Sequence, residues 1–165
     1  MINGLIELIN MVKMYNGTMA EIGCYAGEST EIFLKYGNWK KIVAIDSWQN
    51  GYDDKDKASW KSDMSQVEKT FDLRIQGTCV EKVKGLSSES AHLFEDKTFD
   101  FVYIDACHTY QAVKEDITAW YPKVKDGSFI GGHDVDWPEV NKAILEVIGS
   151  PLKTFSDNSW VLQKR

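Results

Sequence analysis

A glycine-rich turn after an apolar run is the feature that most restricts how this chain can fold. Residues 18–23 are apolar apart from Thr18 and Glu21 and lead into Gly23-Cys24-Tyr25-Ala26-Gly27. A strand that ends in such a turn and enters a helix lets a ligand approach bare backbone. A second apolar run, residues 41–46, ends in Asp46, whose carboxylate can accept hydrogen bonds from ribose hydroxyls. Together they predict a site for a nucleotide-like cofactor in an open α/β sheet.

Strand-like and helix-like segments alternate along the rest of the chain. Strands are expected at 18–23, 41–46, 82–85, 99–105 and 128–132, and helices at 2–15, 29–36, 64–75, 87–94, 110–121 and 137–148. Residues 153–155 and 160–162 read as an antiparallel hairpin. We therefore predict an α/β fold with a doubly wound, Rossmann-like, mostly parallel sheet, helices on both faces and a C-terminal antiparallel hairpin.

Ligands bind outside the carboxyl ends of the strands in such sheets. The residues expected at these ends are Gly23, Asp46, Gly85, Asp105 and Asp134. Their convergence predicts a site more strongly than any single motif does.

The length of 165 residues suits a single domain, residues 1–165, with an N-terminal helix at 1–16. The apolar face of that helix can supply a homo-oligomer contact. Residues 47–63 are too long and polar for a tight connection, which favours a lid or substrate loop. Its aromatic residues Trp48, Tyr52 and Trp60 either close over the ligands, pack in the core or form a subunit contact.

Charge, hydropathy and cysteine content exclude several classes of partner. A formal net charge of −6 argues against nucleic acid, whose phosphates require a basic face. The apolar runs are of strand length, so no membrane span is expected. Three unpaired cysteines and the lack of a signal peptide favour a cytoplasmic protein.

Four segments resemble the class I S-adenosylmethionine-dependent methyltransferases. They are Glu21–Gly27, Ile45-Asp46, Phe99–His108 and Gly131-Gly-His-Asp134. The nearest branch is that of the small-molecule O-methyltransferases that include macrocin O-methyltransferase and the cephalosporin-hydroxylase-like proteins. The resemblance covers residues 18–149 in order and spacing, and the C-terminal hairpin suits the last two strands of that fold.

The resemblance implies where S-adenosylmethionine binds. Gly23 and Gly27 would surround its methionine part, Asp46 would bind the ribose and residues 85–87 would lie beside the adenine. Glu21 is costly to bury unless it meets the cofactor's amino group or a structural ion pair. Many relatives carry an acidic residue where Leu86 stands, so one adenine-side hydrogen bond is in doubt. The predicted cofactor-binding residues are Glu21, Gly23, Tyr25, Gly27, Asp46, Ser47, Leu86, Ser87 and Asp105.

The predicted catalytic residues are Asp105 and His108. An acceptor hydroxyl ionises poorly at neutral pH, so methyl transfer to it requires a base, a metal or both. In the macrocin-type relatives the Asp-x-x-His pattern supplies a metal ligand and a general base. We expect a divalent cation at Asp105, Asp134 and His133. Mg²⁺ is the first candidate, but His133 replaces an acidic residue of metal-dependent relatives and makes Mn²⁺ an alternative.

The resulting hypothesis is methyl transfer from S-adenosylmethionine to a hydroxyl of a small molecule, such as a sugar or natural product. One alternative is a methyltransferase-like module that binds the cofactor without catalysis. The other is an NAD(P)-dependent dehydrogenase, because Tyr110 and Lys114 have the Tyr-x-x-x-Lys spacing of short-chain dehydrogenases.

Overall fold

A seven-stranded sheet forms the centre of the computed structural model, which describes residues 2–13 and 15–165. Residues 1 and 14, which belong to the predicted opening helix, lie outside the described residues. The strand order is β3-β2-β1-β4-β5-β7-β6. The strands are β1 (Gly17–Ile22), β2 (Trp39–Asp46), β3 (Val80–Lys84), β4 (Phe99–Ile104), β5 (Val124–Gly132), β6 (Lys153–Thr154) and β7 (Trp160–Gln163).

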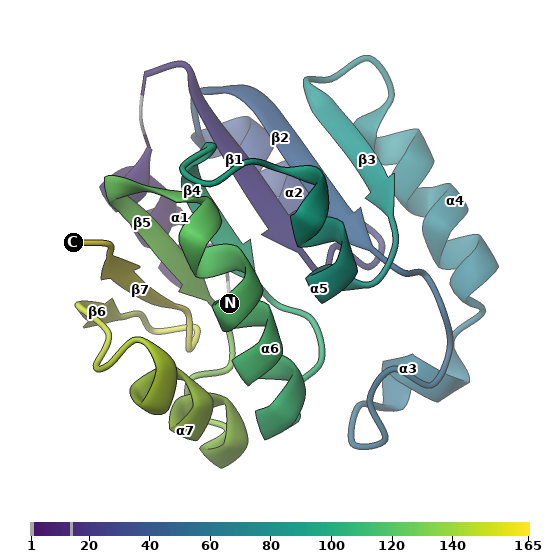
Figure 1. The fold of residues 1–165 in the computed structure, drawn as a ribbon. Helices are drawn as coiled ribbons and strands as arrows, with labels where there is room; N and C mark the ends of the chain where they lie inside the picture. The colour runs from purple at the N-terminus through teal and green to yellow at the C-terminus, as the bar shows by residue number, and fades with distance from the viewer. Residues whose placement is uncertain (1, 14) are drawn as a thin grey trace.

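Neighbouring strands from β3 to β5 are parallel, whereas β7 runs antiparallel to both β5 and β6. Helices cover both faces (Figure 1). The helices are α1 (Ile2–Val12), α2 (Glu28–Tyr36), α3 (Lys57–Lys61), α4 (Met64–Ile75), α5 (Ser87–Ser90), α6 (Tyr110–Trp120) and α7 (Pro138–Val147). The predicted fold class, including the C-terminal antiparallel pair, is confirmed.

The alternation of side chains along β1 divides the core into two layers. Ala20 and Ile22 pack with the apolar faces of α6 and α7. Met19, on the opposite face, packs with residues of α1 and α2. Because strands buried on both faces need apolar side chains at every position, the nearly unbroken apolar runs in the sequence are those of a covered parallel sheet.

The apolar face of α1 is used within the chain itself. Leu5, Leu8, Ile9 and Val12 are buried against the sheet beside Phe33 of α2. That face is therefore not available for the subunit contact that its sequence pattern suggested.

Several element boundaries differ from the sequence-based expectation, and one short helix was not expected. β5 begins at Val124 rather than residue 128, because Asp126-Gly127 forms an irregularity inside the strand, with Gly127 at φ +77°. The polar segment 47–63 contains the five-residue helix α3, whose N-cap Asp56 accepts a hydrogen bond from the Ala58 amide. Within the described residues no helix has the length and hydropathy needed to cross a membrane.

Candidate active site

The carboxyl ends of the parallel strands bring the predicted residues to one edge of the sheet. Gly23 follows β1 with φ +83°, and a Cβ on it would lie 2.0 Å from the main-chain oxygen of Asp105. Only glycine fits there, because any side chain would overlap the chain leaving β4. The first turn and the Asp105 loop are thus packed backbone to backbone.

Asp46 at the end of β2 holds the glycine turn in place. Its Oδ2 accepts hydrogen bonds from the main-chain amides of Cys24 and Tyr25, at 3.0 and 2.9 Å. Its Oδ1 accepts a third, from the amide of Trp48, at 2.7 Å. A carboxylate has about four acceptor positions, so one remains for a ligand hydroxyl.

A cavity of about 310 Å³ lies above these strand ends. Four of the predicted cofactor residues that line it are Gly23, Asp46, Leu86 and Asp105. Tyr25, Ser47 and Ser87 of the predicted set also line it, whereas Gly27 and Glu21 do not. Its wall further includes Tyr52, Met64, Ala106, Cys107 and Asp116. Its floor is therefore formed by the ends of β1, β2 and β4, and α6 contributes to its wall.

A second, larger cavity of about 1140 Å³ adjoins the first. The two share Gly23, Tyr25, Tyr52, Asp105 and Ala106. The larger one also reaches His108 and His133, together with residues of α2. The two cavities thus offer one space for a nucleoside and a neighbouring one for further groups.

Glu21 lies beneath this surface and lines neither cavity. It is fully buried, and its carboxyl accepts hydrogen bonds from the hydroxyls of Ser29 and Thr30, the latter at 2.6 Å. Burial raises its pKa from 4.5 to about 7, although the two hydroxyl groups partly oppose the rise. The structure therefore gives Glu21 two partners at the start of α2, and its contact with a cofactor amine stays a prediction.

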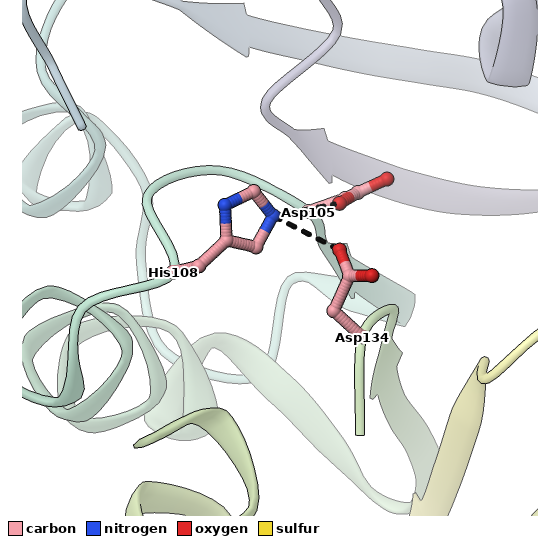
Figure 2. Close-up of side chains that lie close together, drawn as sticks. All are labelled: Asp105, His108 and Asp134. Atoms are coloured by element: carbon pink, nitrogen blue, oxygen red, sulfur yellow. Dashed lines mark ion pairs between the residues drawn. The ribbon is translucent and has the colours of Figure 1, made fainter. Parts of the chain in front are cut away.

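Asp105, His108 and Asp134 form a compact cluster where β4 and β5 end (Figure 2). The Nε2 atom of His108 lies 2.9 Å from Oδ2 of Asp134 and 3.8 Å from Oδ1 of Asp105. One ligand atom from each residue lies within 4.8 Å of the others. Two carboxylate oxygens and one imidazole nitrogen are a donor set that fits a divalent cation such as Mn²⁺.

His133 lies beside the cluster, and its role as a metal ligand stays a prediction. Its Nδ1 lies 3.2 Å from the Oδ2 atom of Asp134, so it pairs with a member of the cluster. That hydrogen bond raises the pKa of His133 to about 9. In the described part of the chain His108, rather than His133, is the imidazole that completes the cluster.

Asp53 is the functional candidate that the sequence analysis missed. Asp53 is buried, and its Oδ2 atom accepts a hydrogen bond from the main-chain amide of His108 at 2.9 Å. The same Oδ2 atom lies 3.1 Å from Nδ1 of the His108 ring. The ring of Trp137 covers the same imidazole at a centroid distance of 4.7 Å. Asp53 lies 55 residues before its partner, so no local spacing could reveal the pair.

The carboxylates around His108 determine its protonation. Burial alone would lower the pKa of His108, but hydrogen bonds and charges from Asp105 and Asp134 overcome this and raise it to about 11. Burial also disfavours ionised Asp134, yet its hydrogen bonds to His108 and His133 hold its pKa well below the usual range. The chain alone therefore carries an imidazolium between carboxylates at neutral pH.

The three aromatic residues of segment 47–63 have different roles. Trp48 is buried against Phe71 and donates a hydrogen bond to the main-chain oxygen of Tyr25. Tyr52 lines both cavities, and Trp60 is 54% exposed. Of the three, Tyr52 is the one in contact with the space for ligands.

The pair that suggested a dehydrogenase lies elsewhere. Lys114 Nζ is 3.3 Å from the hydroxyl of Tyr110, and both bind the exposed carboxylate of Glu146 on α7. Among the described residues that line the two cavities, neither Tyr110 nor Lys114 is found. Their helical spacing reflects a surface contact between α6 and α7.

Several known methyltransferases have similar structures at low sequence identity. CalS11, described as a TDP-rhamnose 3'-O-methyltransferase of calicheamicin biosynthesis, is 18% identical with a TM-score of 0.62, and the match covers 98% of this chain and 77% of CalS11. The O-methyltransferase NovP is 17% identical with a TM-score of 0.69, covering 99% and 76% of the two chains. A putative caffeoyl-CoA O-methyltransferase from Staphylococcus aureus is 18% identical with a TM-score of 0.62, covering 95% and 78%.

The comparison with curated proteins finds no match. Residues 20–135 match the family described as "Methyltransferase domain", whose cofactor is S-adenosylmethionine. That segment runs from β1 to the loop after β5, and so includes every strand end described above. The chain therefore belongs to the methyltransferase domain family and has the fold of the class I S-adenosylmethionine-dependent methyltransferases.

Proposed function

We propose that this protein transfers the methyl group of S-adenosylmethionine to a hydroxyl of a small molecule, with His108 as the general base. The observation that carries the proposal is the Asp105–His108–Asp134 cluster beside both cavities. The cofactor's sulfonium supplies an electrophilic methyl group, and Asp46 with the glycine turn would hold its nucleoside part. The acceptor, a sugar or a natural product, would enter through the larger cavity.

In this proposal His108 takes the proton of the acceptor. Its Nδ1 faces Asp53, which favours a proton on Nδ1, so Nε2 is the atom that turns toward Asp105 and Asp134. As the acceptor oxygen bonds to the methyl carbon and the carbon–sulfur bond breaks, the hydroxyl proton would pass to Nε2. Asp53 would act as a positioning residue that fixes the ring and its tautomer.

A divalent cation fits the same cluster. Asp105 and Asp134 would hold it; bound there, it would polarise the acceptor hydroxyl and offset the negative charge that keeps His108 protonated. With His108 kept as the base, the protein ligands are two carboxylates, a set of hard oxygen donors that suits Mg²⁺ as well as Mn²⁺. The protein itself orients the carboxylate of Asp134. The main-chain amide of Trp137 donates a hydrogen bond to the main-chain oxygen of Asp134, which holds that residue at φ +56°.

The test is a comparison of His108→Ala with His92→Ala, which alters an exposed histidine. Turnover would be followed as S-adenosylhomocysteine release over a panel of hydroxyl acceptors, and cofactor affinity by calorimetry. We expect His108→Ala to lose roughly 10²–10⁴-fold in kcat while binding S-adenosylhomocysteine as the wild type does. His92→Ala should match the wild type in both.

Two results would contradict the proposal. Full turnover by His108→Ala would remove His108 from the chemistry. Tight cofactor binding by the wild type without turnover on any acceptor, with or without Mn²⁺, would favour the module that binds the cofactor without catalysis.

A further inference from the structure

A buried carboxyl group from α6 reaches the smaller cavity and takes no part in the chemistry proposed above. Asp116 is 5% exposed and lines this cavity together with Leu86 and Ser87. Its neighbours on the inner face of α6, Val113, Ile117 and Trp120, are apolar core residues. A carboxyl at such a position is costly unless it has polar partners, so its presence requires an explanation.

The Ser87 hydroxyl is the polar group beside the Asp116 carboxyl, and it is itself bound by another side chain. The indole Nε1 of Trp120 donates to the Ser87 hydroxyl oxygen at 3.0 Å. That bond leaves the proton of the Ser87 hydroxyl available to the Asp116 carboxyl, and this hydroxyl partly lowers the pKa of Asp116. Burial nonetheless raises the pKa of Asp116 from 3.8 to about 7, so this single hydroxyl does not replace the water that the carboxyl lost on folding. A carboxyl has acceptor capacity for more than one donor.

The position of Asp116 along the cavity identifies the part of a ligand that it would meet. Asp46 and Ser47 line the cavity where β2 ends, and the ribose would bind there. Leu86, Ser87 and Asp116 line the part formed by α5 and α6. Leu86 offers an apolar surface to a base and no hydrogen-bond acceptor, so the side chain that can accept from an amine must come from another residue.

We propose that Asp116 accepts a hydrogen bond from the 6-amino group of the cofactor's adenine, and so selects adenine among the purines. This inference rests on the proposed function only in taking S-adenosylmethionine as the ligand of the cavity. Adenine presents an amino donor at position 6, whereas guanine and hypoxanthine present a carbonyl oxygen there. In its ionised form, the carboxyl at the edge of the base attracts the amino donor and repels the carbonyl oxygen. Leu86 then provides the contact surface for the ring and Asp116 provides the selectivity.

The experiment compares two ligands in calorimetric titrations. One is S-adenosylhomocysteine, and the other is its analogue with hydrogen in place of the 6-amino group. The proteins are the wild type, Asp116→Leu, Asp116→Asn and, as a control for the loss of a buried carboxylate, Asp100→Asn. Asp100 lies at the opposite end of β4, where it pairs with Lys125 and the Thr18 amide.

We expect the wild type to bind S-adenosylhomocysteine at least tenfold more tightly than the analogue. Asp116→Leu should lose this preference through weaker binding of S-adenosylhomocysteine alone, with binding of the analogue unchanged. Asp116→Asn keeps a side-chain oxygen and should retain part of the preference, and Asp100→Asn should retain all of it.

An equal preference in the wild type and Asp116→Leu would overturn the inference while leaving the proposed function in place. If Asp116→Leu does not fold, the wild type and Asp116→Asn test the inference instead. Equal affinities of the wild type for the two ligands would overturn it. A preference for S-adenosylhomocysteine that is the same in Asp116→Asn as in the wild type would overturn it as well. Failure of the wild type to bind S-adenosylhomocysteine at all would overturn the proposed function and the inference together.

Discussion

Individual carboxyl groups at the strand ends differ in protonation because their surroundings differ. Glu21 is surrounded by protein and its pKa rises to about 7. Asp134 is also partly buried, but two imidazoles donate to it and hold its pKa low. Sites that separate the pKa values of chemically similar groups in this way can hold an acid and a base at the same pH.

Asp46→Ala should weaken the binding of S-adenosylhomocysteine at least tenfold, about 1.4 kcal/mol. The substitution removes the ribose acceptor and also frees the amides of Cys24, Tyr25 and Trp48. Calorimetric titration would measure the change, with Asp72→Ala on the outer side of α4 as the control. Unchanged affinity in Asp46→Ala would mean that the ribose is placed wrongly.

Glu21→Gln should flatten the dependence of stability on pH. In the folded chain Glu21 keeps its proton up to about pH 7, whereas in the unfolded chain it loses the proton near 4.5. Folding therefore takes up a proton between these values, and the contribution of Glu21 to the free energy of unfolding falls as the pH rises from about 4.5 to 7. The pKa difference corresponds to about 3 kcal/mol.

Urea unfolding at pH 4.5 and pH 8 would measure this effect. The wild type should lose more stability over the interval than Glu21→Gln does, and the exposed Glu95→Gln should behave as the wild type. Equal losses in Glu21→Gln and the wild type would show that Glu21 is ionised in the folded chain at neutral pH.

Among the helices and strands, those with a strong local sequence pattern could be predicted from the sequence. The helix at 64–75 was predicted with the bounds that the structure gives, because Asp63 caps it and the apolar Met64 and Phe71 face inward. α3 was missed because five residues show too little periodicity. The aspartates and His108 could be found from their strand ends, whereas Asp53 could not, since its role depends on how segment 47–63 folds over the loop after β4.

Asp53→Ala should lower kcat at least tenfold and leave the affinity for S-adenosylhomocysteine within about twofold of the wild type. The substitution removes the acceptor of the His108 amide and ring, so the imidazole loses its fixed orientation. Steady-state kinetics and calorimetry would separate the two effects. The adjacent Asp54→Ala, at an exposed position, is the matched control. A kcat equal in Asp53→Ala and Asp54→Ala would leave Asp53 with a structural role in the loop alone.

At the scale of the whole molecule, the Asp105–His108–Asp134 cluster and its neighbour Asp53 come from three separate parts of the chain. Asp105 and His108 follow β4, Asp134 follows β5 and Asp53 belongs to the segment between β2 and α4. Lys55 of the same segment pairs with Glu139 of α7, which also accepts from the Tyr110 amide. A ligand that binds this cluster therefore stabilises contacts distant in sequence, and its binding should appear in the stability of the fold.

Mn²⁺ should raise the unfolding temperature of the wild type and not that of Asp134→Asn. At about a hundredfold excess over its dissociation constant, a ligand of the folded state adds about 2.7 kcal/mol. For a chain of this size this corresponds to an increase of roughly 5–10 °C. Thermal unfolding with and without the cation would measure it, and the exposed Asp96→Asn should respond as the wild type does. An equal increase in Asp134→Asn would place the cation elsewhere.

The three amides bound by Asp46 have a consequence for the thermodynamics of ligand binding. Because these bonds are made within the chain itself, the turn after β1 and the start of segment 47–63 are ordered when the protein folds. Little backbone entropy is then left to lose when a nucleoside enters. The heat-capacity change on binding should accordingly match the apolar surface of the ligand and its pocket, without the larger negative value that accompanies the folding of a loop.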